Sequence, residues 1–340
     1  MKKTNKLFLG IALVLILIAP IFAGCNLFGN NNDTTNQEIF VISNNTLTGL
    51  TEYGKNNATD ISIPSTVTII GQGAFQNCTT IEYVTIPTSV NTISENAFRG
   101  CTNIKSVIMP NSVVSLGKYA FYGCSKLYNI SISNNLTTIP EHCFSYTALT
   151  NVTIPNSVSV VGEYSFNNCT ALRNISIPNS VVTLGQGALR GCYGLKSISL
   201  PNQLTEISSQ LFCESGIESV TIPNSVTKIG SSAFSNSSLS TITIHSNIGS
   251  LEQNAFNGCN SLRTVTIESS SKSLVINYQA FAFCTSLTSI YLPTRCIVGQ
   301  AAFSGCNALT IYCQASSQPD SWHTYWNQWF PNSVYWGSTR

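Results

Sequence analysis

The sequence predicts a strand-rich α/β repeat, a single solenoid of about eleven coils of 22–25 residues each over residues 61–312. Three observations lead to it. A bulky apolar residue recurs at a nearly fixed interval, each interval holds a short stretch of alternating apolar and polar residues, and a proline closes most of these stretches. Such a period is typical of one supersecondary unit stacked many times, so the 340 residues need not divide into two domains.

The recurring residue is Phe in ten copies and Leu in one. The eleven residues are Phe75, Phe98, Phe121, Phe144, Phe166, Leu189, Phe212, Phe234, Phe256, Phe281 and Phe303. The intervals between them are 22 or 23 residues, with one of 25 before the tenth copy. A coil of this size cannot bury its own apolar face, and stacking on its neighbours supplies the missing burial.

Each repeat begins with a predicted strand. In residues 83–86, apolar and polar side chains alternate, which is the pattern of a strand with one buried face. Pro87 cannot donate to a strand ladder and ends the strand. A second apolar pair, Val90 and Ile93, follows. The turn that carries Phe98 comes next, and we expect it to be a single helical or 3-10 turn packed beneath the strand.

Three motifs of the repeat resemble a known family. They are Ile-Pro-Asn-Ser-Val at 154–158, Gly-Gln-Gly-Ala-Phe at 71–75 and Asn-Cys-Thr-Ala-Leu at 168–172. The chain is similar to the BspA-type leucine-rich repeat over roughly residues 60 to 312. The resemblance implies a leucine-rich-repeat solenoid with a parallel sheet on a bacterial surface protein. Several members resemble adhesins for host matrix proteins or other cells, but the family shares no binding residues that could be carried over.

Residues 1–24 have the pattern of a secretory signal peptide. Lysines at positions 2, 3 and 6 precede an apolar run that is shorter than the ~20 residues of a membrane-spanning helix. Residues 21–25, Ile-Phe-Ala-Gly-Cys, resemble the lipobox of bacterial lipoproteins, with Phe22 where Leu is usual. The resemblance implies cleavage before Cys25 and lipid attached to that cysteine. An uncleaved N-terminal anchor is the alternative.

The segments that flank the solenoid are expected to tether and cap it. Residues 25–38 are predicted to be the lipidated cysteine and a flexible, Asn-rich tether. Residues 39–60 are predicted to form an N-terminal cap, and residues 313–340, which hold all four tryptophans, an aromatic C-terminal cap. We therefore expect an extracytoplasmic protein, anchored by lipid to the cell membrane or the outer membrane, with no other membrane contact.

Eight of the thirteen cysteines stand three residues after the recurring residue. They are Cys78, Cys101, Cys124, Cys169, Cys192, Cys259, Cys284 and Cys306. The three repeats that lack this cysteine have a turn one residue shorter, so we expect a buried thiol that fills a pocket of the longer turn. A ladder of disulfides is the alternative. It is disfavoured because coils ~4.8 Å apart hold parallel Cβ atoms beyond the ~3.8 Å of a disulfide.

The outward positions of the predicted strands form two columns made almost entirely of Ser, Thr and Asn. We take this face as the candidate binding surface for an extracellular protein or glycan. The candidate ligand-binding residues are Tyr83, Asn129, Asn151, Asn174, Thr241, Thr243, Thr264, Thr266 and Tyr291. The alternative is that small polar residues only keep the exposed side of the sheet soluble.

Two other regions are candidates for binding. In the irregular coils at 245–284, His245 and Glu268 replace the strand-ending proline and residues 268–273 form an insertion. Such insertions often lie at the binding face of a solenoid, although a tolerated surface loop is the plainer alternative. The C-terminal tail holds Trp322, Tyr325, Trp326, Trp329, Phe330, Tyr335 and Trp336. These rings are expected to cap the stack, or alternatively to form a platform for sugar.

The composition excludes several classes of function. Charged residues make up 9% of the chain and the net charge is +2, so no basic surplus exists for nucleic acid. His142, His245 and His323 stand in separate segments without a nucleophile or paired acid, so we expect no enzyme activity. No Cys-x-x-Cys pair occurs, and we expect no metal and no cofactor.

The sequence thus predicts a monomeric cell-surface adhesin that acts by multivalent contact. A surface-layer or spacer protein without a specific ligand is the alternative. A glycan hydrolase using an acid such as Glu252 or Glu268 is a third hypothesis, which the shortage of paired carboxylates disfavours.

Overall fold

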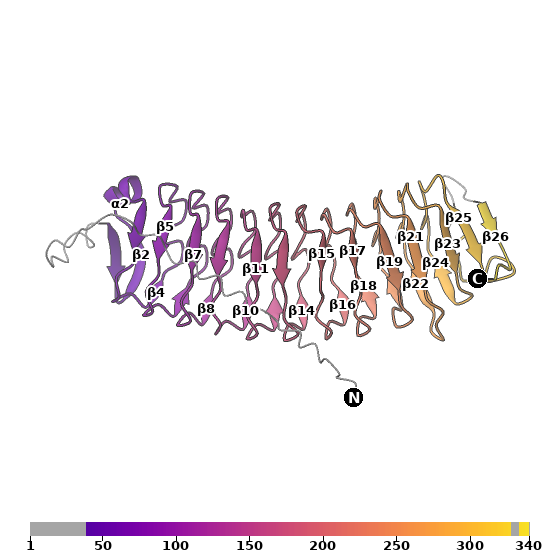
Figure 1. Ribbon diagram of the computed structural model, residues 1–340, viewed down its shortest axis with the longest axis horizontal. Coiled ribbons are helices and arrows are strands. Elements are labelled where there is room, and N and C mark those ends of the chain that lie inside the picture. The colour runs from indigo at the N-terminus through magenta and orange to yellow at the C-terminus, as the bar shows by residue number, and fades with distance from the viewer. Residues whose placement is uncertain (1–38, 328–332, 340) are drawn as a thin grey trace, which may run out of the picture.

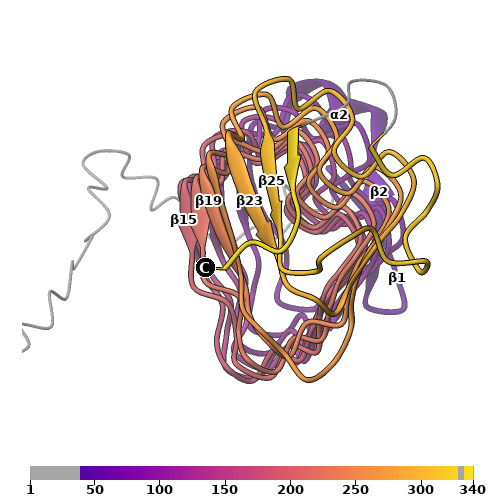
Figure 2. The ribbon, with the colours of Figure 1, turned by 90° about the vertical axis from the view of Figure 1, so that its right-hand side faces the viewer.

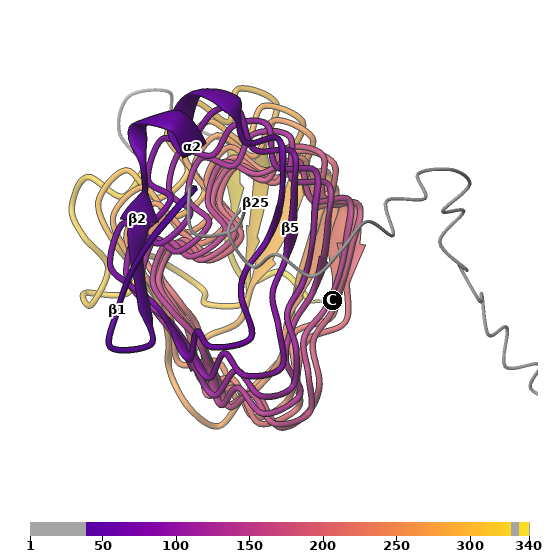
Figure 3. The ribbon, with the colours of Figure 1, turned by 90° about the vertical axis from the view of Figure 1, so that its left-hand side faces the viewer.

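The computed structural model of this protein describes residues 39–327 and 333–339. It is a long stack of about twelve parallel coils with almost no helix (Figure 1). Figures 2 and 3, which look along the stack from its two ends, show closed coils of similar outline, with later coils turned relative to earlier ones. The expected signal segment and tether, with Cys25, and two tail residues, Trp329 and Phe330, lie outside the described residues.

The first strand of every coil lies on one side of the stack, and we call this side the first sheet. Its strands are β3 (Asp60–Ser62), β5 (Tyr83–Thr85), β7 (Ser106–Ile108), β9 (Asn129–Ser131), β11 (Asn151–Thr153), β13 (Asn174–Ser176), β15 (Ser197–Ile198), β17 (Ser219–Val220), β19 (Thr241–Ile244), β21 (Thr264–Ile267), β23 (Ser289–Leu292), β25 (Thr310–Cys313) and β26 (Ser333–Tyr335). Paired neighbours run parallel, as the repeat predicts.

The second apolar pair of each coil forms a second side, the second sheet. Its strands are β2 (Thr46–Leu50), β4 (Ile69–Ile70), β6 (Thr92–Ile93), β8 (Ser115–Leu116), β10 (Thr138–Ile139), β12 (Val160–Val161), β14 (Thr183–Leu184), β16 (Glu206–Ile207), β18 (Lys228–Ile229), β20 (Ser250–Leu251), β22 (Leu274–Ile276) and β24 (Cys296–Val298). A hairpin strand, β1 (Phe40–Ser43), pairs with β2 antiparallel at the N-terminal end.

The segment around the recurring Phe forms the third side, which we call the turn side, and it differs from the prediction. Alternate amides bond in different directions: the Phe75 amide donates to the next coil at Ala97 O (2.7 Å), whereas Cys78 donates back to Phe75 O (3.0 Å). Two residues four apart, such as Gly73 and Asn77, have left-handed φ angles of 62° and 59°. These residues interrupt any helix, so the described repeats hold consecutive four-residue β-turns rather than a helical or 3-10 segment.

The recurring Phe rings stack on one another through the core. Ring centroids of consecutive coils lie 4.8–5.7 Å apart, and the rings are nearly parallel. The rings form two runs, from Phe75 to Phe166 and from Phe212 to Phe303, with Leu189 between them. The core is therefore a continuous column of apolar side chains along the axis, each fully buried by the coils above and below it.

Pairing between coils stops in both sheets at the same place. β13 and β14 belong to the coil of Leu189, and neither pairs with β15 or β16 of the next coil. The turn side still connects these coils, because the Leu189 amide donates to Leu211 O at 3.2 Å. Among the described coils, this seam is the only place where both sheets and the ring column are interrupted together. We therefore expect the coupling between neighbouring coils to be weakest there.

The repeat cysteines are buried free thiols, and they also donate hydrogen bonds. The Cys124 thiol donates to Phe98 O of the preceding coil at 3.1 Å, and the Cys101 thiol to Phe75 O at 2.9 Å. Where the turn is a residue shorter, the Thr147 hydroxyl donates to Phe144 O at 2.9 Å. The thiol thus adds a second donor to a buried carbonyl of the preceding coil, which already accepts an amide of its own coil.

Both ends of the stack carry segments unlike the repeats. At the N-terminal end lie the β1–β2 hairpin and helix α2 (Glu52–Asn57), whose N-cap, Thr51, accepts a hydrogen bond from the Gly54 amide at 3.1 Å. At the other end, the indole of Trp322 donates to Cys296 O at 2.7 Å and packs edge-on against Trp326. Both tryptophans are buried, so they cover the last coil and cannot serve as a sugar platform.

We predict that Phe234→Ala lowers the free energy of unfolding by about 3–5 kcal/mol, because it removes a buried ring stacked on both neighbours. Phe234→Leu should cost less, since the coil of Leu189 already accepts leucine. Equilibrium chemical denaturation measures both changes. A loss below about 1 kcal/mol for the alanine variant would contradict the role given to the ring column.

The repeat thiols are buried, which should keep reagents from reaching them in the native protein. Burial raises the pKa of the Cys124 and Cys259 thiols to about 12, and the thiolate is the reactive form. An aromatic disulfide reagent should therefore label the repeat thiols only after unfolding in guanidinium without reductant. Rapid labelling of the native protein would contradict this prediction. Thiols that remain unlabelled after unfolding would also contradict it, because they would reveal disulfides.

Candidate binding faces

The exposed positions of the first sheet line up as the sequence columns predict. Strand register pairs Asn151 with Asn174 and Thr153 with Ser176, and it pairs Thr241 with Thr264. The side chains of the first and third residues of each strand segment point outward, and those of the middle residues are mostly buried. We call this outward surface, from β5 to β23, the hydroxyl face.

Some candidate residues hydrogen-bond each other along the columns. The Asn174 side-chain amide donates to Asn151 Oδ1 at 2.8 Å, and that of Asn129 donates to Ser106 Oγ at 3.2 Å. The candidate threonines form a block on β19 and β21, where Thr241 pairs with Thr264 and Thr243 with Thr266. These contacts hold the polar groups of neighbouring coils in register.

The two candidate tyrosines lie far apart. Tyr83, on β5 near the N-terminal end, is 46% exposed and lies under the ammonium of Lys105, 5.1 Å from the ring centroid. Tyr291, on β23 near the C-terminal end, donates its hydroxyl to Ser338 O at 3.0 Å. The C-terminal segment therefore lies over this end of the hydroxyl face. The nine candidate residues do not form one compact site.

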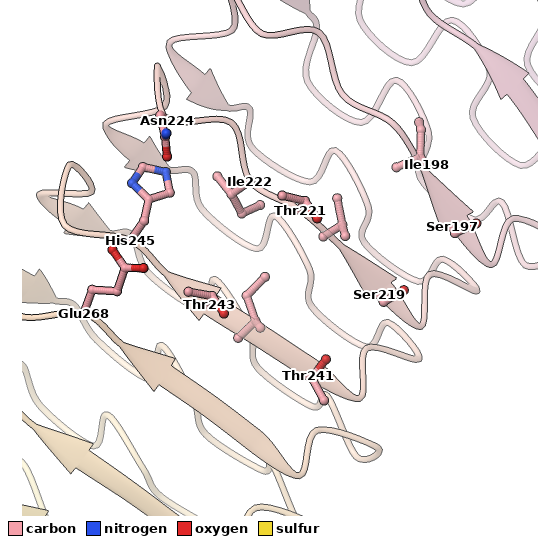
Figure 4. A pocket seen from close by; sticks show the side chains of 12 residues that line it. Ser197, Ile198, Ser219, Thr221, Ile222, Asn224, Thr241, Thr243, His245 and Glu268 are labelled. Carbon is pink, nitrogen blue, oxygen red and sulfur yellow. The ribbon is translucent and has the colours of Figure 1, made fainter. Parts of the chain in front are cut away.

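The larger hollow of the hydroxyl face extends from β15 to β19, with Glu268 at its edge, and has a volume of about 610 Å³ (Figure 4). Hydroxyls of Ser219, Thr221 and Thr243 line it, together with the half-buried Ile198. It lies beside the seam, where the strands are only two residues long. The hollow thus combines hydroxyl groups with some apolar surface, and this combination suits a neutral polar ligand.

Two residues of the irregular coils lie at one end of this hollow. His245 Nε2 donates to Pro223 O at 3.0 Å, and Nδ1 accepts the Asn247 amide at 3.3 Å, which places the ring hydrogen on Nε2. Glu268 accepts the Ser246 amide at 3.1 Å. The structure therefore brings together the threonine block and the irregular coils, which sequence reasoning treated as separate candidates. Both side chains are engaged with backbone groups.

A smaller hollow of about 390 Å³ lies between β9 and β11, lined by Asn129, Asn151 and Thr153. Strand pairing in the first sheet is interrupted between β9 and β11, between β13 and β15 at the seam, and between β17 and β19. Each hollow thus coincides with an interruption of the strand ladder.

The turn side carries a surface that sequence reasoning missed. Tyr119, His142 and Tyr164 come from successive coils and stack face to face, with centroid distances of 4.9 and 5.0 Å. Tyr122 and Tyr146 lie beside this column, edge-on to each other at 5.3 Å. We call these five rings, together with Arg99, the aromatic ledge. The spacings of 23 and 22 residues in the column match the repeat period, which is the signal that could have found it.

Arg99 lies at one end of the ledge. Its guanidinium carbon is 5.6 Å from the Tyr119 ring centroid and 5.1 Å from that of Tyr122, which is cation–π geometry. It makes a hydrogen bond to Asn96 Oδ1 at 3.3 Å, and among the described residues no carboxylate lies within ion-pair distance of it. Most of its donors therefore remain available to a ligand.

The sequence comparisons agree with the repeat geometry. Residues 49–173, 160–275 and 205–320 match the BspA type leucine rich repeat region. The chain belongs to this family. Members of the family are bacterial leucine-rich-repeat surface proteins, and a protein-binding role at the cell surface is the general expectation for them. No match was found among curated proteins.

Two solved structures are similar over most of their length. A leucine-rich repeat protein from Bacteroides ovatus is 26% identical, with a TM-score of 0.60, and the alignment covers 88% of this chain and 89% of that one. A leucine rich cell surface protein from Faecalibacterium prausnitzii is 25% identical, with a TM-score of 0.52 and coverage of 88% and 93%. Both place this repeat among bacterial solenoids.

The described residues contain neither a cluster of three metal-ligating side chains nor a helix that is long and apolar enough to cross a membrane. The His323 side chain also forms a hydrogen bond with the backbone, because its Nδ1 accepts the Tyr325 amide at 3.0 Å. The expectation of a non-catalytic protein is in keeping with a repeat family that is generally non-catalytic.

His142 should make stability depend on pH. Burial between the two tyrosines lowers its pKa below 6.5, and this effect exceeds the opposing fields of Glu141 and Glu163. Below about pH 6.5 the unfolded chain binds this proton before the folded chain does, so stability should fall with pH until His142 is protonated in both states. Melting temperatures over this range measure the effect.

His142→Phe is the matched control, since it keeps a stacked ring and removes the titration. Its melting temperature should fall less between neutral and acidic pH than that of the unmodified protein. Equal pH dependence of the two proteins would show that the pKa of His142 does not differ between the folded and unfolded states.

Proposed function

We propose that this protein is a lipid-anchored, extracytoplasmic adhesin that binds a host matrix protein or a surface glycan through its hydroxyl face. The observation that carries the proposal is the alignment of uncharged Ser, Thr and Asn columns with two hollows on the same face. Family membership supports a cell-surface binding role, and the lipobox resemblance supports the anchor.

The proposed mechanism is the sum of many weak contacts. Successive coils present similar polar groups ~4.8 Å apart, so an extended or repetitive partner can meet several coils at once. The strands are fixed by stacking before the partner arrives, which keeps the entropic cost of binding low. Because the columns carry almost no charge, binding should depend little on salt concentration.

A spacer or surface-layer role is the second candidate, and one observation favours it. Asn151 and Asn174 already bond each other, so part of the hydroxyl face satisfies its own polar groups. In that case the columns would be a soluble coat on a parallel sheet. The two candidates differ in whether changes on this face alter binding to cells or to matrix.

We expect the double variant Asn151→Arg/Asn174→Arg to abolish saturable binding to arrayed matrix proteins and surface glycans. It places two bulky charges in the outward column beside the smaller hollow. The control is Thr138→Arg/Thr183→Arg, which puts the same charges at exposed positions of the second sheet. Loss of binding in both variants, or in neither, would contradict the hydroxyl face as the binding surface.

A further inference from the structure

We propose that the aromatic ledge is a second binding site, on the turn side, and that it takes a neutral carbohydrate chain. The ledge is separate from the hydroxyl face and differs from it in chemistry, because it presents rings and a guanidinium instead of small hydroxyl side chains. The proposal does not rest on the function assigned to the first sheet.

The backbone of the ledge is held in an unfavourable conformation. Tyr119, His142, Tyr146 and Tyr164 have φ angles of 58°, 53°, 60° and 52°. The left-handed region costs a non-glycine residue about 1–2 kcal/mol, and most of the equivalent positions in other coils are Gly, Asn or Ser. Every coil adopts this conformation at the equivalent positions, so the repeat requires the backbone geometry but not aromatic side chains, and four aromatic residues at these positions in adjoining coils need another explanation.

The rings are fixed before any ligand arrives. Arg99 covers the open face of Tyr119 at one end of the column. At the other end the Tyr164 ring lies against Gly187, where an added Cβ would come within 2.3 Å of a ring carbon. Gln186 donates to the Tyr164 hydroxyl at 2.7 Å. A preorganised surface loses little side-chain entropy on binding.

The exposed chemistry of the ledge suits a sugar. Tyr146 is 45% exposed and stacks face to face with no other ring, so it offers an aromatic surface to the C–H face of a pyranose. Arg99 and the tyrosine hydroxyls supply hydrogen-bonding groups at the ring edges. No aliphatic side chain is exposed in these turns, which disfavours the apolar interface core of a protein partner.

The charge balance favours a neutral chain over an acidic one. The cations near the ledge are Arg99, Lys118 and Arg190, and the carboxylates are Glu95, Glu141, Glu163 and Glu214. Arg190 is paired with Glu214 at 3.0 Å. Lys118 is paired with Glu141 at 2.7 Å. The local field is therefore not positive enough to attract a polyanion, and specificity would come from ring contacts and hydrogen bonds.

Affinity electrophoresis of the full chain through gels with a soluble galactomannan, xylan or β-glucan tests the site. We expect retardation in at least one gel. Tyr122→Ala and Tyr146→Ala should each weaken that binding about 2- to 10-fold, the value of one aromatic contact. The control is Tyr53→Ala, which removes a more exposed ring on α2 and should change nothing. Melting temperatures verify that each variant is folded.

The hydroxyl-face variant Asn151→Arg/Asn174→Arg should keep its retardation by polysaccharide, which separates this site from the first sheet. Equal mobility in all gels would overturn the proposal. So would retardation that survives the Tyr122 and Tyr146 changes. If those changes instead abolish saturable binding to immobilised fibronectin or laminin, the ledge binds protein and the carbohydrate assignment is wrong.

Discussion

Each buried Phe ring stacks on the next at a centroid distance of 4.8–5.7 Å. This distance is close to the separation between paired strands. The rings can therefore stack and the strands can pair at the same separation between coils, so every coil can repeat the structure of its neighbour. The buried thiol belongs to the same arrangement, because it completes the hydrogen bonding of the Phe carbonyl in the preceding coil. Where Leu189 replaces Phe, both sheets also lose their pairing.

Columns of side chains on the outside follow directly from this inner regularity. A residue type that recurs with the period becomes a continuous stripe, which is how Ser, Thr and Asn come to form the hydroxyl face. A local departure from the period becomes a local site. The aromatic ledge arises from rings confined to adjoining coils, and the larger hollow from short strands beside the seam. One backbone thus carries two chemically distinct surfaces.

The sequence predicted the stack, the strand register and the buried cysteine position, because all three follow from one period and from the alternation within residues such as 83–86. It did not predict the left-handed turns, since the φ angles of Tyr119 or His142 depend on amides that bond to the next coil. The hollows could not be predicted either, because they depend on where strand pairing stops. The ledge was missed because the period was applied to strands and not to the outward turn positions.

Native-state hydrogen exchange over the whole chain tests the central claim, that ring stacking and strand pairing together couple the coils. We predict two cooperative units, one for the coils from Phe75 to Phe166 and one for those from Phe212 to Phe303. The free energy of opening should change in a step at the coil of Leu189. A single value for all coils, or a gradual slope from end to end without a step, would contradict the account.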